Sequence, residues 1–321
     1  MVTVRYGTHT CELKEGESLL DGLLRHGVPV AHACKAGSCG SCLLRSVEGQ
    51  VPPSAQAGLK DSWKARGYFL ACVCHPTGDL IAEPVGSDIR IAATITALDH
   101  LTHDVVRVHL ACQAPFDFRP GQYLTLFRDD GLARSYSIAN LPEEREIELH
   151  VRRVPNGRMS GWLFEGARTG AQVQLQGPSG ECFYVPGRQD QPILLIATGT
   201  GLAPLYGIVR DALRSGHRGP IHLFHGATRP EGLYLAKELA AMSAAHGNMS
   251  YTACVLQADA PGPFEIGQIG QVVASRFSEL DGWRGFVCGD PSVVRSLKQQ
   301  LFLAGMAMRD IYTDAFLPSA A

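Results

Sequence analysis

The sequence has neither an excess of one charge nor a long apolar run. Its 321 residues carry 29 Lys and Arg against 31 Asp and Glu, a net charge of −2. Nucleic-acid-binding domains usually carry a basic excess, so this balance argues against that class. The longest apolar stretches, such as 193–197, are far shorter than the about 18 residues of a transmembrane helix. The first residues also lack a signal-peptide pattern. We therefore expect a cytoplasmic protein with no nucleic-acid or membrane partner.

What the sequence does contain is an ordinary apolar fraction of 45% and ten cysteines. At roughly 100 to 200 residues per domain, the length predicts two or three packed domains. A reducing compartment disfavours a disulfide framework, so metal binding or catalysis is the expected use of the thiols.

Three of the cysteines form a short motif, C-x4-C-x2-C, at Cys34, Cys39 and Cys42. With one more distant thiol, this spacing is typical of a plant-type [2Fe-2S] cluster. Zinc sites usually show two C-x2-C pairs, and only one is present here. Two thiols, Cys72 and Cys74, could be the fourth ligand. Strand alternation would place both on one face, so geometry alone leaves the choice open.

The flanks of the motif predict a small mixed domain. Residues 2–6 and 10–13 have the pattern of a hairpin, and 18–24 has that of a helix capped by Ser18. Residues 83–87 are expected to form a linker.

The middle third has the texture of a closed antiparallel barrel, with Gly and Pro between short alternating segments. The expected strands are 89–95, 105–110, 123–127, 147–154 and 172–175.

Two segments of this barrel carry chemical groups. Arg134 and Tyr136 share one strand face in Arg-Ser-Tyr-Ser, where the guanidinium suits a pyrophosphate and the ring a flat heterocycle. Residues 150–160 predict a strand, a turn and a short helix capped by Ser160, whose amides could hold a phosphate.

The final third begins with the apolar run 192–197, followed by a glycine turn and a helical pattern. A strand, glycine turn and helix let backbone amides meet a dinucleotide pyrophosphate. Pro204 occupies the place of the last glycine in G-x-G-x-x-G, so the standard fingerprint is not matched.

Two more expected strands, 221–224 and 285–287, end in small or polar residues, as ligand-binding edges of parallel sheets do. After the first of them, Arg229 is the one cation for a 2′-phosphate, and no acidic residue stands at that strand end for the ribose hydroxyls. NADH is therefore preferred, with NADPH as the alternative.

These segments, in this order, resemble the NAD(P)H-dependent reductase components of bacterial multicomponent oxygenases that act in aromatic hydrocarbon catabolism. The resemblance implies a ferredoxin-like β-grasp domain at 1–86, an antiparallel β-barrel FAD domain at 87–188 and an open parallel α/β NAD(P) domain at 189–321. It also implies Cys72 as the fourth iron ligand and Cys74 as a spectator.

The resemblance assigns roles to particular residues. Arg134 would bind the FAD pyrophosphate, Tyr136 would stack on the isoalloxazine, Ser137 would lie near its reactive nitrogen, and Cys288 and Phe316 would lie near the nicotinamide and flavin. The full set of implied cofactor-binding residues is Arg134, Ser135, Tyr136, Ser137, His150, Arg152, Gly157, Met159, Ser160, Thr198, Gly199, Thr200, Gly201, Pro204, Cys288, Gly289, Asp290, Pro291 and Phe316.

The implied activity is electron transfer from NADH through FAD and a [2Fe-2S] cluster to an oxygenase or its ferredoxin, with no protein acid or base. Alternatives are a reductase for a deoxysugar dehydratase or another iron-sulfur acceptor, and a redox sensor without turnover.

Overall fold

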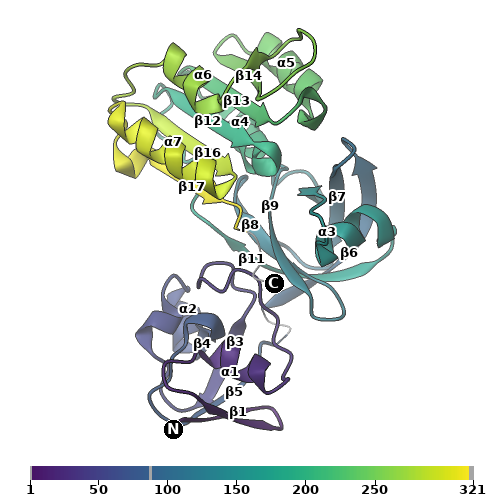
Figure 1. The fold of residues 1–321 in the computed structure, drawn as a ribbon, viewed down its shortest axis with the longest axis vertical. Coiled ribbons are helices and arrows are strands. Elements are labelled where there is room, and N and C mark those ends of the chain that lie inside the picture. The colour runs from purple at the N-terminus through teal and green to yellow at the C-terminus, as the bar shows by residue number, and fades with distance from the viewer. Residues whose placement is uncertain (1, 87–88, 318–321) are drawn as a thin grey trace.

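The computed structural model describes residues 2–86 and 89–317, which form three sheets arranged in chain order. The N-terminal sheet lies at one end of the molecule, an antiparallel barrel lies beside it, and a parallel sheet lies at the other end (Figure 1). The expected succession of a small mixed domain, a barrel and an α/β domain is therefore confirmed.

The N-terminal sheet has five strands in the order β2-β1-β5-β3-β4. Its hairpin and its Ser18-capped helix are present as predicted, and the Ser18 hydroxyl accepts a hydrogen bond from the Asp21 amide at 3.1 Å. The elements are β1 Val2–Tyr6, β2 His9–Leu13, α1 Leu19–Arg25, β3 Leu43–Glu48, η1 Pro53–Gln56, α2 Asp61–Ala65, β4 Tyr68–Leu70, η2 Ala71–Val73 and β5 Leu80–Pro84.

Two expectations about this part are wrong. Residues 83–87 were expected to form a linker. Strand β5 instead extends to Pro84, and Glu83 pairs with Arg45 of β3, so the first two of these residues belong to the sheet. Residue 87 lies outside the described residues. The segment with Cys72 is a 3₁₀ turn, η2, and the strand alternation assumed for Cys72 and Cys74 does not apply there.

The barrel is a six-stranded antiparallel sheet in the order β10-β7-β6-β11-β8-β9. It closes where Ile138, just after β9, pairs with Leu149 of β10. All five expected strands are present: three run further than expected, the one expected at 147–154 ends at Arg152, and a further strand holds Arg134. The elements are β6 Arg90–His100, β7 Val105–Cys112, β8 Tyr123–Phe127, β9 Ala133–Ser137, β10 Ile147–Arg152, α3 Arg158–Gly161, η3 Trp162–Gly166 and β11 Gln172–Ser179.

The helix after β10 differs from the prediction at its cap. Asn156 adopts a left-handed conformation (φ 58°), which places Gly157 at the cap position of α3. Ser160 therefore lies inside the helix, where its hydroxyl accepts from the Val154 amide at 3.1 Å and donates to the Gly157 carbonyl at 3.4 Å. The prediction that Ser160 caps the helix is therefore wrong, because the helix already begins at Arg158.

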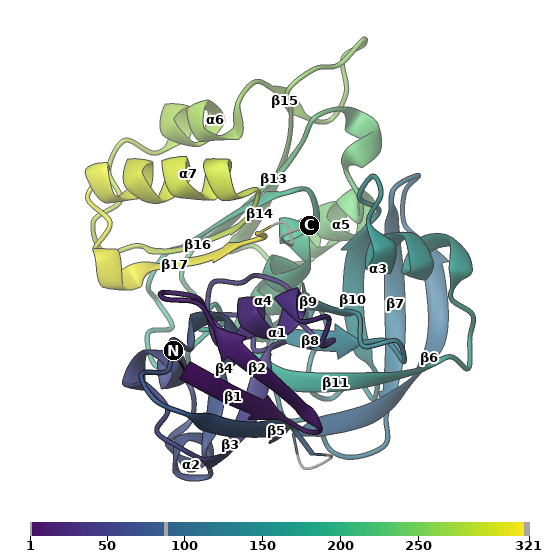
Figure 2. The same ribbon diagram turned by 60° about the horizontal axis from the view of Figure 1, so that its bottom comes forward.

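The C-terminal sheet is parallel, in the order β15-β14-β13-β12-β16-β17. Helices α6 and α7 pack on one face and α4 and α5 on the other (Figure 2). The elements are β12 Ile193–Thr198, η4 Gly199–Gly201, α4 Leu202–Arg214, β13 Ile221–Ala227, η5 Pro230–Gly232, α5 Ala236–Ala245, β14 Met249–Val255, β15 Glu265–Ile266, α6 Ile269–Arg276, β16 Arg284–Gly289, α7 Pro291–Leu303, η6 Met308–Asp310 and β17 Ile311–Ala315. Within the described ranges, no helix is long and apolar enough to span a bilayer.

Candidate functional site: three cofactor sites around one cavity

The four cysteines of the predicted cluster approach one another in two pairs. The thiol of Cys34 lies beside that of Cys39, and the thiol of Cys42 lies beside that of Cys72. No group of three or more His, Cys, Asp or Glu side chains in 2–86 and 89–317 converges on one point suited to a single ion. Two pairs of thiols fit a two-iron cluster, in which each iron takes two of the four protein sulfurs.

Polar hydrogens surround the sulfur of Cys34. The Ala36 amide donates to it at 3.3 Å and the Ser38 hydroxyl at 3.4 Å. The hydrogen bond from Cys39, together with those from Ser38 and Ala36, lowers the pKa of the Cys34 thiol to about 4. The thiolate is the metal-binding form, and the Ala36 and Ser38 donors stabilise it at Cys34.

The two candidates for the fourth ligand have different surroundings. The hydrogen bond from Cys42 lowers the pKa of the Cys72 thiol, and the Gly37 amide also donates to this sulfur. Cys74 is fully buried in the apolar core, and burial raises the pKa of its thiol to about 12. The position of Cys72 beside Cys42 favours Cys72, the residue that the resemblance implies, as the ligand.

The Arg-Ser-Tyr-Ser strand, β9, lines a cavity of about 2700 Å³ that also reaches the cluster loop and the edge of the parallel sheet. Arg134 and Tyr136 both lie on this cavity. Arg134 donates to the Ala133 carbonyl at 2.7 Å, and within 2–86 and 89–317 it makes no ion pair. An arginine without a carboxylate partner on a large cavity fits the pyrophosphate of FAD.

Ser137 lies on β9, the predicted flavin strand, and donates a hydrogen bond to Asp314 of β17 at 3.0 Å. Burial raises the pKa of the Asp314 carboxyl, and the Ser137 hydroxyl opposes that rise. Both residues line the cavity, as does Phe316. Strand β17 is thereby tied to β9, and Phe316, which the resemblance places near the flavin, follows β17 directly.

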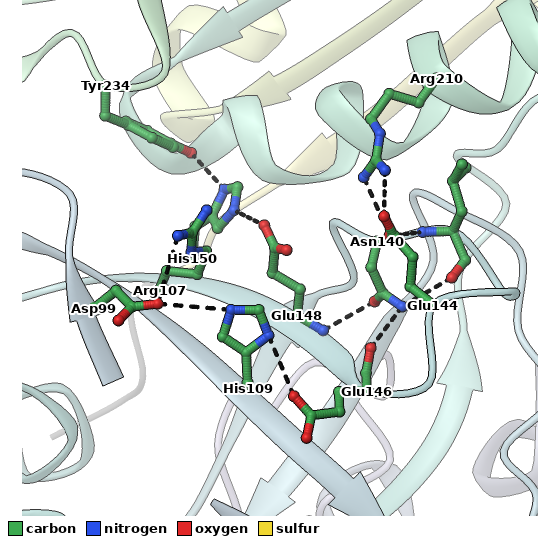
Figure 3. A network of polar contacts seen from close by, with 11 residues as sticks. Asp99, Arg107, His109, Asn140, Glu144, Glu146, Glu148, His150, Arg210 and Tyr234 are labelled. Carbon is green, nitrogen blue, oxygen red and sulfur yellow. Dashed lines mark hydrogen bonds and ion pairs between the residues drawn. The ribbon is translucent and has the colours of Figure 1, made fainter. Parts of the chain in front are cut away.

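His150 is the buried centre of a polar network between the barrel and the parallel sheet (Figure 3). Its Nε2 lies 2.7 Å from Glu148 Oε1, and its Nδ1 lies 3.1 Å from the Tyr234 hydroxyl. Burial lowers the pKa of His150 more than Glu148 raises it. Neutral His150 can donate from Nε2 to Glu148 and accept at Nδ1 from Tyr234. An ion pair, Arg210 with Glu144, also joins helix α4 to the barrel.

The edge of the parallel sheet supplies the third part of the cavity. The Thr198 hydroxyl accepts from the Asp290 amide at 3.0 Å, which joins the ends of β12 and β16. The Asp290 carboxylate caps α7 by accepting from the Ser292 and Val293 amides.

Most predicted cofactor residues line this cavity. Those brought together are Arg134, Ser135, Tyr136, Ser137, His150, Arg152, Gly157, Met159, Ser160, Thr198, Gly199, Thr200, Gly289, Asp290, Pro291 and Phe316, with Cys34 and Cys39 of the cluster loop. Gly201, Pro204 and Cys288 are buried and do not line it.

Cys288 lies behind the cavity wall. Its sulfur is 3.6 Å from that of Cys182, and both side chains are buried. Burial raises the pKa of Cys288, as does the neighbouring Cys182 thiol. Its predicted position near the nicotinamide stays a prediction.

The region expected to choose the nicotinamide contains carboxylates that the strand pattern did not reveal. Arg229 forms an ion pair with Asp259 at 3.1 Å, and Glu231 lines the cavity. Asp259 is distant in sequence, so no local pattern could have placed it there.

The sequence analysis also missed the contacts that hold the cluster loop against the barrel. Tyr123, Thr125 and Gln176 each donate to a carbonyl of this loop. Tyr123 and Thr125 are two residues apart on β8 and therefore share a strand face, but nothing local in the sequence indicates what that face contacts.

Comparisons with known proteins agree with this geometry. Residues 2–77 match the model of the 2Fe-2S iron-sulfur cluster binding domain, 92–184 that of the oxidoreductase FAD-binding domain, and 195–299 that of the oxidoreductase NAD-binding domain. These matches show that the chain has sites for a [2Fe-2S] cluster, FAD and a nicotinamide coenzyme.

The chain is 36% identical to the ferredoxin--NAD(P)(+) reductase component of a naphthalene 1,2-dioxygenase system from Pseudomonas putida, over 94% of each chain. It is 31% identical to the reductase subunit of an aromatic O-demethylase from Amycolatopsis, over 99% of each. Its fold matches the Amycolatopsis cytochrome P450 reductase GcoB (TM-score 0.71, 30% identity, 99% of each chain). It also matches a ferredoxin reductase in carbazole 1,9a-dioxygenase (TM-score 0.69, 29% identity, 98% of each chain).

Proposed function

Because this chain belongs to the family of NAD(P)H-dependent reductase components of oxygenase systems, we propose that it delivers electrons from NADH to the oxygenase of an aromatic-ring oxygenase system, or to that oxygenase's ferredoxin. One NADH yields NAD⁺, a proton and two electrons, which reduce two equivalents of a one-electron acceptor. Bound FAD supplies the conversion from hydride to single electrons. The ten free thiols support a reducing, cytoplasmic setting.

The observation that carries this proposal is the single cavity. Cys34 and Cys39 lie at its cluster end, Tyr136 lies on the flavin strand, and Thr200 and Asp290 lie at the nucleotide edge. One chain therefore brings the coenzyme site, the flavin site and the cluster site to one space, in the order that electron flow requires.

The residues of this chain would divide the work of binding. Arg134 would neutralise the FAD pyrophosphate, and Tyr136 would cover the ring system and shield it from water. Residues 157–160 would close over the phosphates. Ser137 and Asp314 would keep a hydrogen-bonded wall next to the flavin. We propose domain boundaries at 1–86, 87–188 and 189–321 for these three tasks.

We propose NADH as the preferred coenzyme. Arg229 is paired with Asp259, and Glu231 faces the same cavity. These carboxylates repel a 2′-phosphate, whereas acidic groups can accept hydrogen bonds from the ribose hydroxyls of NADH. The measurement is the ratio of kcat/KM for the two coenzymes, and a ratio that favours NADPH would contradict this choice.

The test of the activity is a visible and EPR spectrum of the holoprotein before and after anaerobic NADH. Bleaching of the flavin and a reduced-cluster EPR signal are expected, and an unchanged spectrum would defeat the proposal. Reconstitution with a purified aromatic oxygenase, beside a deoxysugar dehydratase as the rival acceptor, then identifies the acceptor class.

A further inference from the structure

Three side chains of the barrel donate hydrogen bonds to three successive carbonyls of the cluster loop. The Tyr123 hydroxyl donates to Ser38 O at 2.7 Å, Thr125 Oγ1 to Cys39 O at 2.7 Å, and Gln176 Nε2 to Gly40 O at 2.8 Å. We call Tyr123, Thr125 and Gln176 the loop latch. Each donor of the loop latch bonds to a backbone oxygen, so the contact depends on the backbone shape of the loop rather than on its side chains.

The sheet register places the loop latch on one surface. Tyr123 and Thr125 are two residues apart on β8, and Thr125 is the antiparallel neighbour of Gln176 on β11. Thr125 and Gln176 are 2% and 4% exposed, respectively. Buried hydrogen bonds of this kind are costly to leave unmade, so the docked loop is favoured over a separated one.

Thr125 also connects the two cofactor sites. Its Oγ1 lies 3.3 Å from the hydroxyl of Ser135, on the Arg-Ser-Tyr-Ser strand. The same Oγ1 donates to the carbonyl of Cys39, a predicted iron ligand. Two hydrogen-bond contacts therefore join the flavin strand to the cluster loop through one threonine.

The loop has a glycine where the latch approaches. Gly40 has φ +71°, and a Cβ there would lie 3.1 Å from Gln176 Nε2. Glycine allows both the left-handed backbone and the close approach of the amide. The loop and the barrel surface are matched at this contact.

We propose that the loop latch is a positioning device, which holds the cluster loop against the flavin strand and thereby sets the rate of electron transfer between the two sites. This inference rests on the proposed function. All three donors are uncharged side chains, so the docked arrangement does not depend on ion pairs. Release of the loop requires three hydrogen bonds to break together.

The experiment compares the full-length holoprotein with the double variant Thr125→Val, Gln176→Leu. Thr94→Val is the matched control, because Thr94 lies on β6 of the same barrel and its side chain hydrogen-bonds Gln172 rather than the cluster loop. One readout is anaerobic stopped-flow absorbance, which separates flavin reduction by NADH from the later reduction of the cluster. The other is hydrogen–deuterium exchange of amides 36–43, which needs no turnover.

The double variant should reduce its flavin at the normal rate but its cluster more slowly, by about tenfold or more for two lost hydrogen bonds. Its loop amides should exchange faster by a similar factor. Thr94→Val should match the parent in both readouts.

Unchanged loop exchange in the double variant would overturn the docking role, and faster exchange without slower cluster reduction would overturn the positioning role. Failure of NADH to reduce the parent flavin would instead defeat the proposed function, and exchange would still decide the docking role. If the double variant lost its cofactors, the Gln176→Leu single variant would give the same two readouts, with about a threefold change expected.

Discussion

The barrel meets the parallel sheet through a shared apolar core, but it meets the cluster loop through hydrogen bonds to backbone oxygens. On the first side, Val105 of β7 packs in one core with Tyr184 and with residues of β12 and α4. On the second side, the core of the N-terminal sheet closes on itself between Val4 and Ile89. Among the residues that the structure describes, the N-terminal unit thus draws only Ile89 from beyond residue 86 into its core, whereas Val105, Cys182 and Tyr184 of the barrel module pack in the core of the parallel sheet.

The polar groups at the two interfaces also differ: ionisable side chains cross the first interface, and uncharged groups cross the second. Buried His150, Glu148 and Tyr234 and the Arg210–Glu144 ion pair cross the first interface (Figure 3). The hydrogen bonds between the barrel and the cluster loop are made by neutral side-chain donors and backbone carbonyls. Coenzyme and flavin need a fixed geometry for hydride transfer, whereas a cluster that serves an external acceptor benefits from a contact that can open.

The largest expected effect concerns the independence of the N-terminal unit. Cys72→Ser should abolish the visible cluster spectrum completely, because the pair with Cys42 is lost. NADH should still bleach the flavin, since the cores of the barrel and the parallel sheet contain none of the described residues of 1–86. Absorbance with and without NADH measures both effects.

Cys74→Ser is the matched control. It should keep the cluster spectrum while losing about 1–3 kcal/mol of stability, because a buried hydroxyl replaces the thiol. Loss of the spectrum in Cys74→Ser but not in Cys72→Ser would reverse the ligand assignment.

The second prediction compares one glycine at each interface. A Cβ on Gly121 would lie 2.4 Å from the Cys182 carbonyl and 2.6 Å from Ile208 Cδ1, at φ +96°. Gly121→Val should therefore cost about 3 kcal/mol or more, since the shared core cannot yield. Gly40→Ala should cost only about 1–2 kcal/mol, the left-handed penalty, because Gln176 can move.

Calorimetry of the holoprotein measures the difference. Gly121→Val should lower the transition of the barrel and parallel sheet, and Gly40→Ala that of the N-terminal unit. A common shift of all transitions in both variants would contradict the division into one fixed and one separable interface.

The third prediction is a pH dependence to which the fixed interface contributes. Burial lowers the pKa of His150, and it lowers that of His225 to about 4. The unfolded chain therefore binds more protons below a pKa of about 6.5, and stability falls as pH drops from there toward the folded pKa values.

His225 should cost about 1–2 kcal/mol between about pH 7.5 and about pH 5, and His150 should add to this loss in the same direction. Urea unfolding followed by circular dichroism measures this loss, and His150→Gln should show a smaller one. An equal loss in parent and variant would remove His150 from the account. The pKa of Glu148 is also lowered, because the hydrogen bond and charge of His150 and the nearby cations together outweigh the opposing effect of burial. This carboxylate therefore remains charged across the same pH range.

The smallest effect is expected from salt. The loop latch contains no charged side chain, so flavin-to-cluster transfer should change by less than about twofold between about 0.05 M and about 0.5 M NaCl. Stopped-flow rates at several salt concentrations measure it. A steep decrease would show that ion pairs hold the cluster loop, and the contrast between the two interfaces would then lose its basis.

Local signals predicted much of this molecule. Ser18 marks a helix start through its own hydroxyl, and the apolar run before Thr198 marks a buried strand, because both depend on neighbours in the chain. The prediction for Ser160 failed because the left-handed Asn156 shifted the helix cap by three residues. The strand alternation assumed at Cys72 failed because a 3₁₀ turn has a different period.

The sequence by itself determined the cluster motif and the order of the three modules, because these depend on spacing along the chain, and it predicted residues for each cofactor. Only the tertiary structure decided which thiols pair, that Cys288 lies against Cys182, and that Asp259 meets Arg229. It also decided that Tyr123, Thr125 and Gln176 hold the cluster loop. Each of these contacts joins segments that are distant in sequence, and their approach depends on how whole sheets pack rather than on any local pattern.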